Sequence, residues 1–124
     1  MNKENTEYLL KKFPQLYQRH MLPMSETCMC WGFDCGDGWF GIIEKLSEQL
    51  EPLGVIAEQV KEKYGGLRFY YDGPPEADEY VMAAEEQSLE TCEVCGEPGT
   101  INEGGWLQVR CSECGGKRRD GSGI

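Results

Sequence analysis

The sequence Cys92-Glu93-Val94-Cys95-Gly96 is followed by Cys111-Ser112-Glu113-Cys114-Gly115, with fifteen residues between Cys95 and Cys111. Two CxxC pairs at this separation match the four-cysteine zinc template, in which each pair lies on a tight turn and all four thiolates bind one tetrahedral ion. A glycine follows each pair, where the turn needs a residue that tolerates positive φ. We therefore predict one structural Zn²⁺ bound by Cys92, Cys95, Cys111 and Cys114.

The segment between the two pairs has the pattern of a β-hairpin. Strand-forming residues at Thr100-Ile101 and at 106–110 flank a turn at 102–105. A hairpin with a CxxC pair at each end is a zinc ribbon. Four thiolates fill the coordination sphere and leave no position for water or substrate, so the ion is expected to be structural rather than catalytic.

A chain of 124 residues can hold one modest core with a metal-held appendage. We predict an α+β fold, with a small helix and β-hairpin body over 1–90 and the four-cysteine zinc ribbon over 91–116. Residues 117–124 are basic and then glycine-rich, which predicts a flexible tail.

Two helices are expected in the first half of the body. One covers residues 6–13, with Thr6 as a possible N-cap, and ends before Pro14. The other follows Asp37 as its N-cap and has an apolar stripe at 4, 3, 4 spacing, made by Trp39, Ile43, Leu46 and Leu50. The stripe predicts a helix that packs on the core.

The second half of the body has the pattern of a β-hairpin followed by a helix. Residues 55–61 and 67–71 have strand character, and Tyr64-Gly65-Gly66 supplies the turn. Alternation places Leu67, Phe69 and Tyr71 on the core face. A further helix is expected over 76–89, and it leads into Cys92 without a linker.

The location of the protein is inferred from features of its amino terminus and its apolar content. Residues 1–6 are polar and do not have the apolar core of a signal peptide, and no apolar run is long enough to span a bilayer. A reducing cytoplasm keeps thiols free, which agrees with seven cysteines, an odd number. A cytoplasmic protein is therefore expected.

The net charge of −10 is concentrated in one stretch. Residues 69–109 contain ten acids and no Lys or Arg, while the rest of the chain has twelve acids and twelve bases. Such a surface repels duplex nucleic acid and attracts basic proteins, including nucleic-acid-binding ones, so Glu79 and Glu86 become candidate partner contacts. The alternative is a solvated helix face that keeps the protein soluble.

The long irregular segment 20–38 is the best candidate for a further site. His20, Cys28, Cys30 and Cys35 could form a second Cys₃His zinc site, although buried free cysteines are also common in cores. Asp34 and Asp37 could bind a divalent cation or act as an acid/base pair in a metal-dependent hydrolase. The alternative for both aspartates is capping and turn formation.

The outer face of the predicted hairpin is aromatic and basic. Arg68 and Tyr70 share it, with Lys61 and Lys63 opposite. Together with Trp31, these residues could bind a small nucleotide-like signalling ligand by stacking and phosphate contacts. The alternative is a solvated sheet face.

Three motifs resemble an uncharacterised family of small bacteriophage and prophage proteins. They are residues 30–39, with the sequence CWGFDCGDGW, residues 61–70, with the sequence KEKYGGLRFY, and the CEVCG of residues 92–96. The resemblance covers nearly the whole chain and implies an accessory protein made in the host bacterial cytoplasm, but it supplies no catalytic or binding residues. The hypothesis is a non-catalytic phage protein that inhibits a host protein, such as one of anti-phage defence.

Overall fold

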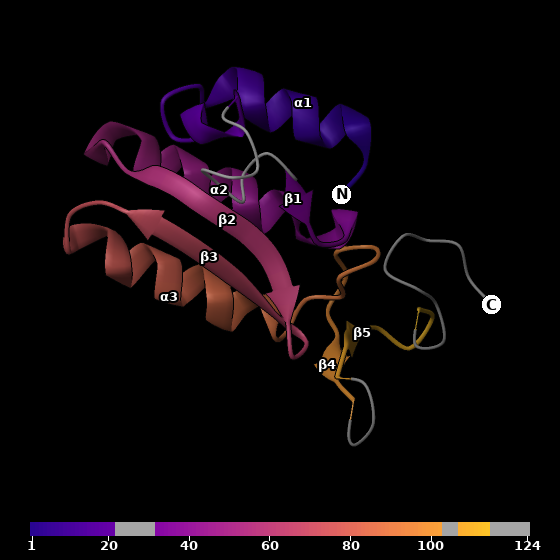
Figure 1. The fold of residues 1–124 in the computed structure, drawn as a ribbon. Coiled ribbons are helices and arrows are strands. Elements are labelled where there is room, and N and C mark those ends of the chain that lie inside the picture. The colour runs from indigo at the N-terminus through magenta and orange to yellow at the C-terminus, as the bar shows by residue number, and fades with distance from the viewer. Residues whose placement is uncertain (22–31, 103–106, 115–124) are drawn as a thin grey trace.

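The computed structural model of the protein describes residues 1–21, 32–102 and 107–114. In these ranges the body contains three helices, α1 (Lys3–Lys12), α2 (Phe40–Leu50) and α3 (Glu76–Ser88), and three strands, β1 (Phe33–Asp34), β2 (Ile56–Lys63) and β3 (Gly66–Asp72). The ribbon contributes β4 (Thr100–Ile101) and β5 (Val109–Arg110) (Figure 1). The predicted α+β fold with a C-terminal four-cysteine ribbon is confirmed.

Several predictions fall on residues outside the described ranges. These are the contacts of Trp31, the ligands Cys28 and Cys30, the ribbon turn over 103–105 with Trp106, and the tail 117–124.

The short 3₁₀ turns η1 (Gln18–Met21), η3 (Asp37–Trp39) and η4 (Glu51–Leu53) connect the longer elements.

The hairpin of β2 and β3 is the centre of the body. The strands are antiparallel, and the two turn residues Tyr64 and Gly65 have φ values of +53° and +88°, as a type I′ turn requires. Strand β1, which the sequence did not predict, runs parallel to β2 on its other side and pairs Phe33 with Val60. The sheet order is therefore β1-β2-β3.

One face of the sheet and the apolar stripe of α2 form the core. Val60, Leu67 and Phe69 from the hairpin are buried, as are all four residues of the predicted stripe (Trp39, Ile43, Leu46 and Leu50). The Tyr17 hydroxyl lies in the same core, 2.6 Å from Ser47 Oγ. Burial raises the pKa of Tyr17 well above its ordinary value, so the phenol stays neutral.

Helix α3 covers the free edge of the sheet. Its small-residue row, Ala77, Val81, Ala84 and Ser88, is buried. The backbone N–H of Leu67 donates to Ser88 Oγ at 2.9 Å, and that of Phe69 donates to Glu85 Oε2 at 3.1 Å. Figure 1 shows α3 running beside β3. Side chains of the helix thus satisfy donors that an open edge strand would leave exposed.

Two predicted helix caps are wrong. Helix α1 begins at Lys3, because Asn2 is the N-cap and its Oδ1 accepts from Asn5 N at 2.7 Å, whereas Thr6 lies inside the helix. Helix α2 begins after η3, and its N-cap position is Trp39. Asp37 instead holds the start of α1, because its Oδ1 accepts from Asn2 N at 2.7 Å and from Asn5 Nδ2 at 3.2 Å.

Candidate metal centre

The four ribbon cysteines converge on one point. The Sγ atoms of Cys92, Cys95, Cys111 and Cys114 all lie within 4.8 Å of one another, and the Cys95 and Cys111 sulfurs are 3.6 Å apart. A tetrahedral ion with metal–sulfur bonds of about 2.3 Å requires sulfur–sulfur distances of roughly 3.8 Å. The cluster therefore fits a tetrahedral metal ion that binds four thiolates.

Tight turns present the sulfurs from each CxxC pair. Gly96 N donates to Cys92 O at 2.9 Å, and Cys114 N donates to Cys111 O at 3.2 Å. Gly96 has a φ of +83°, in agreement with the predicted need for glycine after the first pair. Strands β4 and β5 pair Thr100 with Arg110, which brings the second turn back to the first.

The ionisation of the thiols differs across the cluster. Burial opposes the Cys92 thiolate, but backbone hydrogen bonds from Cys111, Cys95 and Val94 outweigh it and lower the pKa of Cys92 to about 7. Burial and the neighbouring thiols raise the pKa of Cys114 to about 12. Because a metal binds thiolates, its binding must release the Cys114 proton, and affinity for the metal should rise with pH.

Glu93 joins the two turns from inside the ribbon. Its side chain is 2% exposed, although it lies between the two cysteines of the first pair. Its backbone N–H donates to Val109 O at 3.1 Å, and its Oε1 lies 3.4 Å from an Arg110 guanidinium nitrogen. Arg110, which is 7% exposed, directly precedes Cys111. The buried ion pair therefore links the first CxxC turn to the start of the second.

Glu93 also joins the ribbon to the body. Gly36 N donates to Glu93 Oε2 and Gly38 N to Glu93 O, both at 2.8 Å. A Cβ atom on Gly36 would overlap the Glu93 carbonyl oxygen, and one on Gly38 would overlap the Cys92 carbonyl oxygen. Segment 36–38 thus needs two glycines because it lies directly against the first metal-binding turn.

Trp39 completes this junction. Its ring is fully buried in the body core, and its Nε1 donates to Thr91 O at 2.9 Å, one residue before Cys92. Sequence reasoning did not find Glu93, Arg110 or the contact role of Gly36 and Gly38. The available signals were the glycines on both sides of Asp37 and the arginine adjacent to Cys111.

The structure describes some of the residues of the acidic and cysteine sites predicted in segment 20–38. Asp37 is engaged with Asn2 and Asn5, and Asp34 is exposed on β1 opposite Lys61. Cys35 is 1% exposed within the body core, and His20 is half-buried. Among the described residues, the ribbon cysteines form the one group of three or more metal-ligating side chains. Both the Cys₃His site and the Asp34/Asp37 hydrolase stay predictions.

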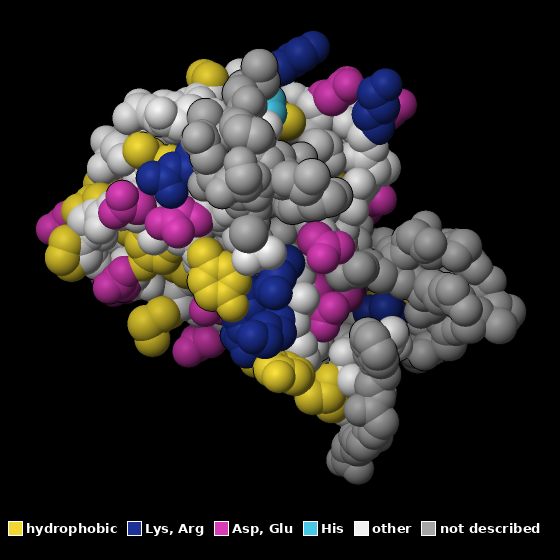
Figure 2. All heavy atoms as spheres, viewed as in Figure 1, with side chains coloured by type: hydrophobic (Ala, Val, Ile, Leu, Met, Phe, Trp, Pro, Cys, Tyr) yellow, Lys and Arg dark blue, Asp and Glu magenta, His cyan; other side chains and the backbone are white. Residues whose placement is uncertain are grey.

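The predicted aromatic and basic residues lie on the outer sheet face. Lys61 is opposite Arg68, and Tyr70 is opposite Gln59, while Lys63 Nζ lies 5.5 Å from the centre of the Tyr64 ring. Figure 2 shows Lys and Arg side chains gathered over the hairpin near its turn, with hydrophobic side chains on either side. The ribbon meets this end of the hairpin, because a Cβ on Gly65 would contact the Ile101 side chain.

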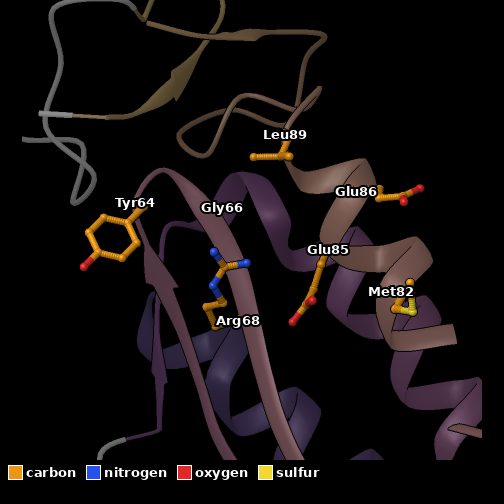
Figure 3. A pocket seen from close by; sticks show the side chains of 7 residues that line it. All are labelled: Tyr64, Gly66, Arg68, Met82, Glu85, Glu86 and Leu89. Atoms are coloured by element: carbon orange, nitrogen blue, oxygen red, sulfur yellow. The ribbon is translucent and has the colours of Figure 1, made fainter. Parts of the chain in front are cut away.

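A hollow of about 260 Å³ opens between β3 and α3. Tyr64, Gly66 and Arg68 line it from the hairpin, and Met82, Glu85, Glu86 and Leu89 line it from the helix. Figure 3 shows the Arg68 side chain standing between Tyr64 and Glu85. The hollow therefore connects the basic face of the hairpin to the acidic helix.

No family model, no curated protein and no solved structure matches the chain. The resemblance to a phage family consequently stays a prediction. In the described part of the chain, no helix combines the length and apolar character needed to cross a membrane.

Proposed function

We propose that this protein is a non-catalytic bacteriophage accessory protein that binds and inhibits a host protein in the bacterial cytoplasm. We further propose that the ion in its ribbon is zinc. Four thiolates in a tetrahedral arrangement favour Zn²⁺ over harder metals, which prefer oxygen ligands. Four protein ligands leave no open coordination position, so the ion supports the fold rather than a reaction.

The outward face of α3 is the observation that carries the proposal. Glu79 and Glu86 are exposed on the side of the helix opposite the buried row, and Glu90 is exposed in the turn that follows the helix. Beside them, Met82 and Tyr80 are 60% and 38% exposed. A field of carboxylates speeds the approach of a basic partner, and exposed aromatic and thioether side chains supply the apolar contacts that hold it.

The proposed partner is a basic protein, such as a host protein that binds nucleic acid. The basic groove of this partner would bind the carboxylates of α3 in place of the phosphates of its nucleic acid. The bound protein would thereby inhibit the partner. The resemblance to phage accessory proteins favours a target among host proteins of anti-phage defence. Duplex nucleic acid is not the proposed ligand, because the carboxylates of α3 repel phosphates.

Site-specific photo-crosslinking tests this proposal. A photoreactive amino acid is placed at Met82 and, as a control, at Lys11, which is exposed on α1. Each protein is irradiated in a bacterial lysate, and adducts are identified by mass spectrometry. We expect a basic protein that is captured from Met82 and not from Lys11. Equal capture from both positions, or none, would contradict the proposal.

The affinity of the purified partner then tests the role of charge. The variant Glu79→Gln/Glu86→Gln should bind at least about tenfold more weakly at low salt, and the difference should shrink as salt rises. The matched control is Glu4→Gln/Glu7→Gln, which removes two exposed carboxylates from α1. Equal weakening by the two variants would show that net charge, rather than α3, determines binding.

A further inference from the structure

The outer face of the hairpin carries cations in an arrangement that does not help the fold. Lys61 and Arg68 are directly opposite each other in the β2–β3 register, and Lys63 lies two residues further along the same face. Like charges directly opposite each other destabilise a sheet. The pairing therefore gives no structural reason for Lys61 and Arg68 both to be basic.

The three hairpin cations form no close ion pair. In the described parts of the chain, Lys12, Arg19 and Arg110 each have a carboxylate oxygen within 4.0 Å, whereas the hairpin cations, like Lys3, Lys11 and Lys45, do not. What distinguishes Lys61, Lys63 and Arg68 is that they share one face of the hairpin in a chain with a net charge of −10, which favours an anionic ligand there.

One exposed tyrosine lies at each end of the basic cluster. Tyr64, in the turn, is 69% exposed, and Tyr70 is 41% exposed. From Gly66 to Tyr70 the strand rises about 13 Å, so the two rings are too far apart to stack on one base. Exposed aromatic rings that alternate with cations are the usual platform for single-stranded nucleic acid, since every base has a face that can stack.

We propose that the outer face of the β2–β3 hairpin binds single-stranded nucleic acid. Lys61, Lys63 and Arg68 bind the phosphates, and two bases of the strand stack on Tyr64 and Tyr70. The hollow between β3 and α3 extends this surface, because Tyr64 and Arg68 line both. This ligand goes beyond the proposed protein partner, which binds the outward face of α3.

The neighbouring helix makes the surface selective for a single strand. Glu85 and Glu86 border the hollow on the α3 side, where a second strand would bring its own phosphates. Repulsion between these phosphates and the carboxylates disfavours a duplex. A single strand can lie along the hairpin with its phosphates directed to the cations and its bases directed to the rings.

Fluorescence anisotropy with a labelled deoxythymidine decamer tests the proposal. At about 50 mM salt the protein should bind the decamer, with a slope of log affinity against log salt near −2, as expected for three cations on a single strand. Lys61→Gln/Arg68→Gln should weaken binding about tenfold or more and bring the slope close to −0.7. Tyr70→Ala should weaken binding by roughly 5- to 100-fold through the lost stacking.

Matched variants serve as controls. Lys11→Gln/Lys45→Gln removes the same charge from exposed positions on α1 and α2, and Tyr8→Ala removes an exposed ring from α1. Both should bind the decamer within about twofold of the unchanged protein, since neither alters a phosphate or stacking contact. Unchanged metal content, and a melting temperature no lower than that of the unchanged protein, would show in every variant that the fold is intact.

Four results would overturn the proposal. They are no binding of the decamer, equal weakening by the control variants, equal affinity for a ten-base-pair duplex, and competition by a thymidine dinucleotide as strong as that by the unlabelled decamer. The last would identify a small nucleotide, rather than a strand, as the ligand.

Discussion

The body and the ribbon of this protein are stabilised by different interactions. The body buries one continuous apolar cluster, to which all three helices and the sheet contribute. The described residues of the ribbon that are buried include two cysteine ligands and an ion pair (Cys92, Cys114, Glu93 and Arg110), with Val109 as the aliphatic residue among them. The ribbon therefore has little apolar core of its own and would depend on its polar contacts and on a metal ion held by the four cysteines, whereas the body depends on apolar burial.

The comparison also shows that the two regions are not independent. Glu93 donates to Val109 in the ribbon, and it accepts from Arg110 in the ribbon and from Gly36 and Gly38 in the body. Trp39 Nε1 donates to Thr91 O from the body side. A change in the metal centre should consequently reach the start of α2. The predictions that follow separate the contributions of the ion, the buried ion pair, the close backbone contact and the surface charge.

The largest effect is expected from loss of the metal. Cys92→Ser removes a buried ligand, and zinc binding contributes on the order of 10 kcal/mol to folding such a site. The ribbon should unfold while the body core remains folded, because no body residue supplies a ligand among the described residues. Elemental analysis would show metal loss, and amide NMR spectra would show collapse of the ribbon signals, with changes in the body confined to segment 36–38 and the start of α2.

Cys35→Ser is the matched control for that experiment. Cys35 is buried in the body core, so the variant should keep its metal and lose only packing stability, about 1 kcal/mol. Retention of the ion by Cys92→Ser, or its loss from Cys35→Ser, would contradict the assignment of the ligands.

The next largest effect should come from Glu93→Gln. Removing one charge of a buried ion pair leaves the other in an apolar environment and typically costs 3–5 kcal/mol, which is about the size expected here. Urea unfolding of the metal-bound protein would measure it. A double variant, Glu93→Gln/Arg110→Met, should recover part of the loss. Equal instability of the single and double variants would show that the Glu93 contacts to Gly36 dominate.

A smaller effect is expected at the contact between the body and the ribbon. Gly38→Ala would place a methyl group on the Cys92 carbonyl oxygen, and relief of that overlap should cost about 1–3 kcal/mol. Gly41→Ala is the matched control, because no atom lies within 4 Å of its Cβ position in α2, where alanine should stabilise the helix by up to about 1 kcal/mol. Thermal unfolding should show a lower melting temperature for Gly38→Ala and a higher one for Gly41→Ala. A lower melting temperature in both variants would refute the contact.

The smallest effect concerns the outer face of the hairpin. Lys61→Gln removes one of two like charges that face each other across β2 and β3, so the fold should become more stable by about 0.2–1 kcal/mol. Urea unfolding at low and high salt would measure it, and the gain should vanish at high salt. Destabilisation at both salt concentrations would mean that Lys61 has a structural role.

Local patterns predicted much of this fold. The 4, 3, 4 stripe, the strand alternation around Tyr64-Gly65 and the two CxxC pairs each depend on neighbours in sequence, and all three lie where they were expected. Strand β1 was missed because two residues carry no periodicity, and its pairing with β2 depends on tertiary contact. Glu93 is one of the ten acids from which an acidic surface is predicted over 69–109, and its burial cannot be seen in the sequence without its partner Arg110.

Segment 20–38 also shows that a sequence pattern does not reveal tertiary contacts. Its glycines and aspartates were interpreted as a candidate site, whereas 36–38 lies against the metal-binding turn and Asp37 bonds to the start of α1. Residues 57 positions apart in the chain make this contact, as the hydrogen bond from Gly36 to Glu93 shows. Only the folded chain reveals that such glycines serve a close approach between two backbones.

The hydrogen bonds from β3 to Ser88 and Glu85 have a consequence for recognition. Because they fix α3 to the sheet by its own side chains, the exposed row on the opposite side of the helix is preorganised before any partner arrives. Complex formation would then not include the entropic cost of ordering that helix, and it should involve little backbone rearrangement. Selection among basic proteins would then rest on shape as well as charge.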